Sequence, residues 1–127
     1  VKPFFLHKLM GLFKAKKTNN FNWLVLNDEK SYIDAIDTSF NEPILIFKHS
    51  TRCSISTLAL NRIESKSEGK SINCCYYLDL LSFRDISNKI EEDFNVFHQS
   101  PQILVIKNGK CVFHTSHSNI NWDNITY

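Results

Sequence analysis

The chain has 127 residues, of which 43% are hydrophobic and 13% aromatic, with only three Gly and three Pro. This length and composition predict a single packed domain and exclude a disordered chain. The formal net charge of +2 is unevenly placed, because residues 1–27 carry five lysines and no acidic residue. The remaining ten basic and thirteen acidic residues give the body a net charge of −3, which does not favour nucleic-acid binding.

The four cysteines do not form the dense framework of a small secreted scaffold; they are Cys53, Cys74, Cys75 and Cys111. No C-x-x-C pair and no zinc-ligand spacing occurs in the sequence, so we expect no metal site. Neither a cleavable signal nor an apolar run long enough to span a membrane is evident. We therefore expect a cytoplasmic protein in a reducing compartment, where a conspicuous thiol is more often reactive than structural.

Residues 1–20 form a basic amphipathic extension, distinct from the domain expected over residues 21–127. Its apolar residues share one helical face, and they are Phe5, Leu9, Leu12 and Phe13. An extension that is disordered or docked on the domain is favoured over a helix on a membrane surface, so no membrane contact is expected. Met10 is an alternative start of the natural chain, with residues 1–9 then derived from upstream sequence or from cloning.

Strands and helices alternate along the rest of the chain. In chain order, the pattern predicts a strand at 22–26, a helix at 31–40, a strand at 43–48, a helix at 54–64, a strand at 71–80, a helix at 86–94, strands at 102–107 and 110–116, and a last helical turn within 119–127. Ser31 and Asp34 form a capping-box pattern, and Asn108-Gly109 predicts a tight hairpin turn. This order predicts an α/β fold with a mixed five-stranded sheet and helices on both faces.

The spacing of apolar residues also predicts which side chains face the core. The run 43–48 is apolar up to its final lysine, as expected of a strand buried on both faces. The helical residues expected to face inward are Ile33, Ile36 and Phe40, then Ile55, Leu58, Ala59 and Ile63, then Ile86, Ile90 and Phe94.

Cys53 stands at the junction between the strand at 43–48 and the helix at 54–64. Free backbone N–H groups and the positive end of the helix dipole stabilise a thiolate at such a position. Further positive charge is expected from Lys48, His49 and Arg52. The opposing interpretation is a buried, inert thiol that happens to lie at a junction.

Ser56 stands three residues after Cys53, where a two-thiol oxidoreductase carries its second cysteine. Serine cannot close an internal disulfide, so a mixed disulfide on Cys53 must wait for an external thiol. The Ser56 hydroxyl is also expected to reach back toward the sulfur. The other three cysteines are expected at the far end of the sheet, beyond the limit of about 7 Å between disulfide-bonded Cα atoms, where they serve packing.

Four separated motifs, FKHSTRCSIS, YLDL, FHQSPQILVIKNGK and FHTSHSNI, together resemble the YtxJ-like family of monothiol bacilliredoxins over about residues 22–127. The resemblance implies a thioredoxin-like, three-layer fold. It also implies an enzyme that removes bacillithiol from mixed disulfides on S-thiolated client proteins, with bacillithiol as co-substrate and no bound cofactor. Many members carry proline after the cysteine where this chain has Ser54, a change that bears on the redox potential without removing the thiol.

In that fold Ser100-Pro101 takes the position of a cis-proline that faces the active-site cysteine. The last strand returns to the same end, so its histidines are candidates to pair with ligand carboxylates, although surface histidines without a ligand role are an equal alternative. The candidate site comprises Cys53, Ser56 and Arg52 as catalytic residues and His49, Ser100, Pro101, His114 and His117 as substrate-binding residues.

Two other classes of function stay open. A non-catalytic thioredoxin-fold binding module would keep the fold without needing an exposed, reactive thiol. An iron–sulfur carrier of the monothiol glutaredoxin type would need a paired thiol ligand and usually a glycine in the active-site loop, where this chain has Ser54 and Ile55.

Overall fold

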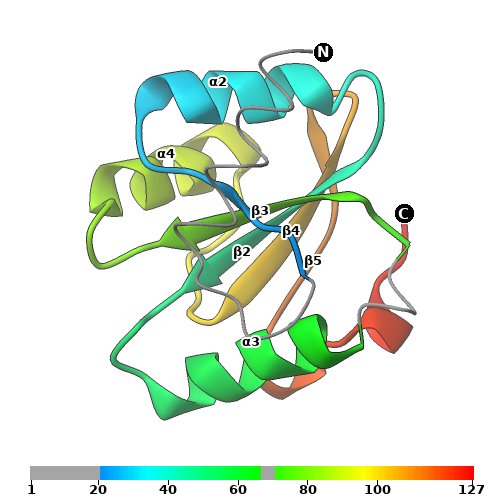
Figure 1. Cartoon of the computed structure of the whole chain (residues 1–127). Coiled ribbons are helices and arrows are strands. Elements are labelled where there is room, and N and C mark those ends of the chain that lie inside the picture. Colours follow the sequence, from blue (N-terminus) through cyan, green and yellow to red (C-terminus); the bar gives the residue numbers. More distant parts are fainter. Residues whose placement is uncertain (1–20, 67–70) are drawn as a thin grey trace.

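The computed structural model describes residues 21–66 and 71–127 (Figure 1), and the expected extension at 1–20 lies outside these ranges. Its elements are β1 (Leu24–Val25), α2 (Glu29–Thr38), β2 (Ile44–His49), α3 (Ser54–Ser65), β3 (Cys74–Asp79), α4 (Arg84–Phe94), β4 (Gln102–Lys107), β5 (Lys110–Ser116) and two 3₁₀ turns, His117–Asn119 and Trp122–Asn124. All the predicted strands and helices are present, and the expected last helical turn is a 3₁₀ turn. Within the described ranges, none of the helices is long and apolar enough to cross a membrane.

The five strands form one mixed sheet in the order β1-β3-β2-β4-β5. β3 pairs in parallel with both β1 and β2, whereas β4 runs antiparallel to β2 and β5 antiparallel to β4. The β4–β5 hairpin turns at Asn108 and Gly109, which both have positive φ, of 53° and 75°. The predicted α/β class is confirmed.

The sheet has helices on both faces, with α3 on one side and α2 and α4 on the other (Figure 1). β2 lies in the middle and all of its residues are buried. Because successive strand residues point to opposite faces, Leu45 and Phe47 pack in the cluster that contains α3, whereas Ile44 and Ile46 pack in the cluster that contains α2 and α4. The strand at the centre of the sheet therefore contributes to two separate cores.

The start of α2 corrects the predicted capping box. Asp28, rather than Ser31, is the N-cap, and its carboxylate accepts a hydrogen bond from the Ser31 N–H at 2.7 Å. The Ser31 hydroxyl in turn accepts from the Asp28 N–H at 3.2 Å. Asp34 instead pairs with Lys30 at 3.2 Å on the helix surface. Aspartate is as favourable as serine at the N-cap position. With Asp28 as the N-cap, α2 begins at Glu29, which is earlier than the predicted start at residue 31.

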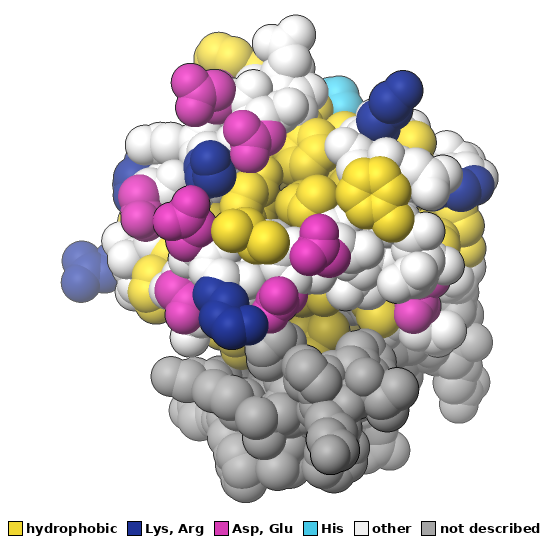
Figure 2. Space-filling view, turned by 90° about the horizontal axis from the view of Figure 1, so that it is seen from above, with side chains coloured by type: hydrophobic (Ala, Val, Ile, Leu, Met, Phe, Trp, Pro, Cys, Tyr) yellow, Lys and Arg dark blue, Asp and Glu magenta, His cyan; other side chains and the backbone are white. Residues whose placement is uncertain are grey.

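The buried faces of α2 and α3 also differ from those predicted. Four of the residues expected inside are about half exposed, namely Ile33, Phe40, Ile55 and Leu58. The helices bury other residues against the sheet, namely Tyr32 and Ala35 in α2 and Ser56, Ala59, Leu60, Ile63 and Glu64 in α3. On the side of α2 and α4, hydrophobic side chains show at the surface among acidic and basic ones (Figure 2). Both helices carry apolar residues on more than one face, so docking on the sheet selected the face; in α4 the predicted Ile86 and Ile90 are buried.

Candidate active site

Cys53 is the N-cap of α3, with an extended backbone at φ −113° and ψ 121°. Its N–H donates to the Ser50 carbonyl at 3.1 Å, which closes a turn after β2, and its carbonyl accepts the first helical bond from Thr57 at 3.1 Å. Its side chain is half-buried and makes no capping bond with the N–H groups of the first turn. A thiol thus stands at the positive end of a 12-residue helix.

The Ser56 side chain lies in the interior, beneath the turn that carries Cys53. Its Oγ accepts from the Ser50 N–H at 3.0 Å and lies 2.6 Å from His49 Nδ1. The expected contact of this hydroxyl with the sulfur is not among its hydrogen bonds: Ser56 is fully buried, and its hydroxyl is bonded to β2 and the turn. The hydroxyl therefore holds the cysteine-bearing turn against the end of the strand.

His49 ends β2 and is only 4% exposed. Its ring packs against the rings of Phe47 and Tyr77, with centroid distances of 6.0 and 5.6 Å. The side chain supports the active-site turn from inside, so it does not lie on the surface where a direct substrate contact was expected.

Lys48 points to the opposite face of the sheet, so the expectation that it adds charge beside Cys53 is wrong. Its ammonium donates to the Ser87 carbonyl of α4 at 3.2 Å and lies 3.4 Å from His98 Nδ1. Burial lowers the pKa of Lys48 to about 8, with a partial opposing effect from the Glu91 carboxylate. Burial and then the Lys48 charge lower the pKa of His98 as well. Sequence reasoning missed this contact between buried Lys48 and half-buried His98; the position of Lys48 in an otherwise apolar strand was a signal for its own burial only.

The loop before β4 contains the predicted cis peptide bond, between Ser100 and Pro101. Gln102, the next residue, is opposite Lys48 in the sheet register and donates from its amide to the Phe97 carbonyl at 3.0 Å. The proline loop therefore lies at the same end of the sheet as the turn that follows β2. Direct packing of Pro101 against the Cys53 sulfur stays a prediction.

The end of β5 returns to this loop, as the sequence predicted, because the His117 N–H donates to the Pro101 carbonyl at 3.1 Å. Arg62 of α3, which sequence reasoning did not single out, donates to the His117 carbonyl at 2.8 Å. His114 is opposite Leu104, whose side chain packs on the side of α2 and α4, so its side chain points away from the α3 face. Both histidines and Arg52 are exposed, and their ligand role stays a prediction.

All four cysteines are free thiols. Cys74 and Cys75 begin β3, opposite the first residues of β2, and Cys111 is opposite Ile106 near the start of β5. They lie at the end of the sheet away from Cys53, as predicted, and burial raises the pKa of the Cys111 thiol. In the part of the chain that the structure describes, no group of three His, Cys, Asp or Glu side chains is arranged to hold a metal ion.

Comparison with solved structures defines the class of protein. A putative oxidoreductase with a thioredoxin fold superposes with a TM-score of 0.70 at 29% identity, over 79% of this chain and 87% of that one. Thioredoxin from Fasciola hepatica gives a TM-score of 0.61 at 18% identity, over 75% and 86% of the two chains. Thioredoxin from Trypanosoma brucei brucei gives 0.64 at 12% identity, over 81% and 85%. The chain has the thioredoxin fold, with a cysteine at the start of the helix that follows the central strand.

Within the thioredoxin fold, the sequence also identifies the family of this chain. Residues 25–125 match the family Monothiol bacilliredoxin BrxC, and the chain belongs to that family. The resemblance noted in the four sequence motifs is therefore confirmed, and the protein is of the thiol oxidoreductase kind.

Proposed function

We propose that the protein is a monothiol thiol–disulfide oxidoreductase that removes bacillithiol from mixed disulfides on client proteins through Cys53. One observation carries the proposal: Cys53 caps α3 with a half-buried thiol, and a buried serine hydroxyl occupies position 56, where a second thiol would stand. The family match supports the monothiol chemistry.

In the first step the Cys53 thiolate attacks the bacillithiol sulfur of the client mixed disulfide. A disulfide forms between Cys53 and bacillithiol, the client–bacillithiol bond breaks, and the client cysteine leaves as a thiolate that takes a proton from water. The sulfur that begins this step stands at the N-cap of α3, at the positive end of the helix dipole, and its side chain makes no hydrogen bond with the first-turn N–H groups. Ser56 and His49 act as positioning residues that hold the turn from beneath.

In the second step a free bacillithiol thiolate attacks the bacillithiol sulfur bound to Cys53. The products are oxidised bacillithiol, with its new disulfide, and the regenerated Cys53 thiolate. Arg52, on the exposed turn, and His117, beside the proline loop, are proposed to attract the carboxylates of bacillithiol. Such a cycle needs a supply of reduced thiol, which fits the reducing cytoplasm.

Intact mass spectrometry tests the proposal on the full chain. Reduced protein is mixed with a model protein carrying a bacillithiol mixed disulfide, and one adduct should move to Cys53 and persist until free bacillithiol is added. An absent adduct, or faster transfer of glutathione than of bacillithiol, would contradict the proposal.

A matched variant separates one-thiol from two-thiol chemistry. In Ser56→Cys the new thiol lies one helical turn from Cys53, a spacing that permits a disulfide. This variant should expel bacillithiol by itself and gain an internal disulfide, seen as loss of the adduct and of two hydrogens. An adduct as long-lived as that of the natural protein would show that residue 56 cannot reach the sulfur.

A further inference from the structure

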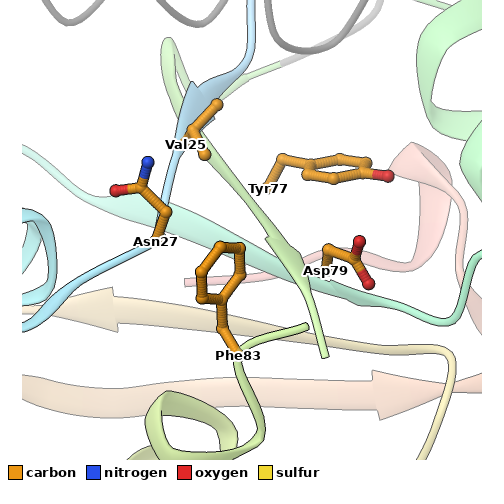
Figure 3. Close-up of a pocket in the computed structure, with 5 residues that line it drawn as sticks. All are labelled: Val25, Asn27, Tyr77, Asp79 and Phe83. Atoms are coloured by element: carbon orange, nitrogen blue, oxygen red, sulfur yellow. The ribbon is translucent and has the colours of Figure 1, made fainter. Parts of the chain in front are cut away.

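A cavity of about 170 Å³ opens at the carboxyl ends of β1 and β3 (Figure 3). It is lined by Val25, Asn27, Tyr77, Asp79 and Phe83. Sites that enclose a whole small molecule usually measure roughly 300–1,000 Å³. This cavity is therefore of a size to hold one part of a ligand whose remainder lies outside it.

The cavity adjoins the strand that leads to Cys53. Asp79 is opposite His49 in the parallel register of β3 and β2, and the Leu80 N–H donates to the His49 carbonyl at 3.0 Å. Tyr77 packs against the His49 ring, and that ring contacts the Ser56 hydroxyl beneath the active-site turn. Neighbouring strands lie about 4.8 Å apart, so a small thiol with its sulfur on Cys53 can extend sideways toward the cavity.

Two polar groups in the lining have hydrogen-bonding capacity that the described part of the protein does not use. Among residues 21–66 and 71–127, neither the Tyr77 hydroxyl nor the Asn27 side-chain amide has a hydrogen-bond partner. Burial, with smaller effects of Asp79 and Glu64, raises the pKa of Tyr77 to about 12, so its hydroxyl keeps the proton and can donate. Asn27 offers both a donor and an acceptor.

Asp79 supplies a fixed carboxylate. Its Oδ1 accepts from the Leu81 N–H at 3.2 Å and its Oδ2 accepts from the Ser82 hydroxyl at 3.1 Å. These bonds orient the group, and each carboxylate oxygen keeps a further lone pair for a ligand donor. Asp79 is the one charged residue among the described residues of the lining, and it favours hydroxyl or ammonium groups and repels a ligand carboxylate.

The rings of Phe83 and Tyr77 add apolar surface to this polar set (Figure 3). The lining thus offers three polar groups (a carboxylate, an amide and a phenol) beside two aromatic rings. A matching ligand ring would present C–H groups on its face to the aromatic rings and hydroxyl or amine groups at its edge to the polar groups. That description fits a sugar or an aminosugar, and it does not fit a peptide end that carries a carboxylate.

We infer that this cavity binds the sugar portion of a sugar-linked thiol whose sulfur exchanges at Cys53. The inference rests on the proposed function, and it adds the residues that select the thiol: Asn27, Tyr77 and Asp79. A peptide thiol such as glutathione has no sugar ring to place in this cavity.

Exchange rates with two thiols test the assignment. The rate of Cys53 thiolation is measured with oxidised bacillithiol and with oxidised glutathione for the natural protein, Asp79→Asn and Tyr77→Phe. The ratio of the two rates should fall about tenfold in Asp79→Asn and a few-fold in Tyr77→Phe, because a hydrogen bond to a charged group is the stronger. In the matched control Asp37→Asn, an exposed acid on α2, the ratio should stay the same. Equal losses with both thiols, or an unchanged ratio, would overturn the inference.

A thiol-free probe separates this inference from the proposed function. Methyl α-D-glucosaminide is titrated into the Cys53→Ala protein, and NMR shifts are followed at Tyr77 and Phe83. Shifts at these rings support the cavity even where the natural protein fails to exchange bacillithiol, which would contradict the proposed function alone. If bacillithiol exchanges normally while the rings do not respond, the cavity inference is wrong and the proposed function stands.

Discussion

Lys48 and His49 are neighbours at the end of β2, and both side chains are buried, yet the sheet separates them completely. His49 lies on the α3 face, where its ring nitrogen is 2.6 Å from the Ser56 hydroxyl under the reactive turn. Lys48 lies on the opposite face, where its ammonium makes longer contacts of 3.2 and 3.4 Å with Ser87 and His98.

The two faces of the sheet accommodate buried polar groups in different ways. Beneath the reactive turn, the α3 face joins the Ser56 hydroxyl to His49 Nδ1 and to the Ser50 N–H at 2.6 and 3.0 Å, which suits a turn that must hold Cys53 in one geometry. The other face buries a cation, whose desolvation is only partly offset by Glu91. We therefore expect changes on the α3 face to alter reactivity and changes at Lys48 to alter stability and its pH dependence.

The largest expected effect is that of Cys53→Ala, which should abolish thiol–disulfide exchange because the reacting sulfur is gone. Cys111→Ala is the matched control and should keep activity within a few-fold, since Cys111 lies at the far end of the sheet. Single-turnover transfer from a thiolated model protein measures both. Exchange by Cys53→Ala would show that the α3 face is not the reactive one.

Lys48→Met should stabilise the protein near pH 7 and remove a pH dependence. The folded-state pKa of Lys48 lies at about 8, below its ordinary 10.5, so between these values the unfolded state holds more protons and stability rises with pH. Below pH 8 the cost of the buried cation is fully present, up to about 3 kcal/mol.

Urea denaturation at pH 7, 8.5 and 9.5 measures this effect. The natural protein should gain stability across the series and Lys48→Met should not. Lys89→Met, at an exposed site on α4, serves as control and should behave like the natural protein. Parallel curves for the natural protein and Lys48→Met would mean that the buried cation costs little.

Ser56→Ala should cost about 1–3 kcal/mol of unfolding free energy, because the Ser50 N–H and His49 Nδ1 each lose a buried partner. Exchange should slow several-fold as the turn loosens. Ser54→Ala, on the exposed side of the same helix turn, should change stability by less than about 0.5 kcal/mol. Equal stability of the two variants would show that the short contact with His49 does not hold the turn.

The smallest effect is expected for His98→Gln. Burial and the Lys48 charge hold the pKa of His98 below its ordinary 6.5, while Glu91 opposes them. The unfolded state therefore takes up a proton first as the pH falls below 6.5, and the natural protein loses stability in acid. His98→Gln should lose less stability between pH 7 and 5.5 in urea titrations, whereas His114→Gln, at an exposed position on β5, should match the natural protein.

Local sequence features determined the elements and their order. Apolar runs and helical spacing placed the strands and helices, and Asn108-Gly109 specified the hairpin because both residues accept positive φ. The Cys53 junction and the cis bond before Pro101 were also predicted, since each depends on neighbouring residues and on the family pattern.

Tertiary structure decided which face each residue occupies. Periodicity gives the spacing of a helix's apolar residues, but α2 and α3 carry such residues on several sides, so packing against the sheet left Ile33 and Leu58 outside. The Ser56 hydroxyl went to His49 rather than to the sulfur because α3 docks with that side against β2. The cavity beside Tyr77 likewise exists only because parallel pairing brings the ends of β1 and β3 together, a contact between strands that are distant in sequence.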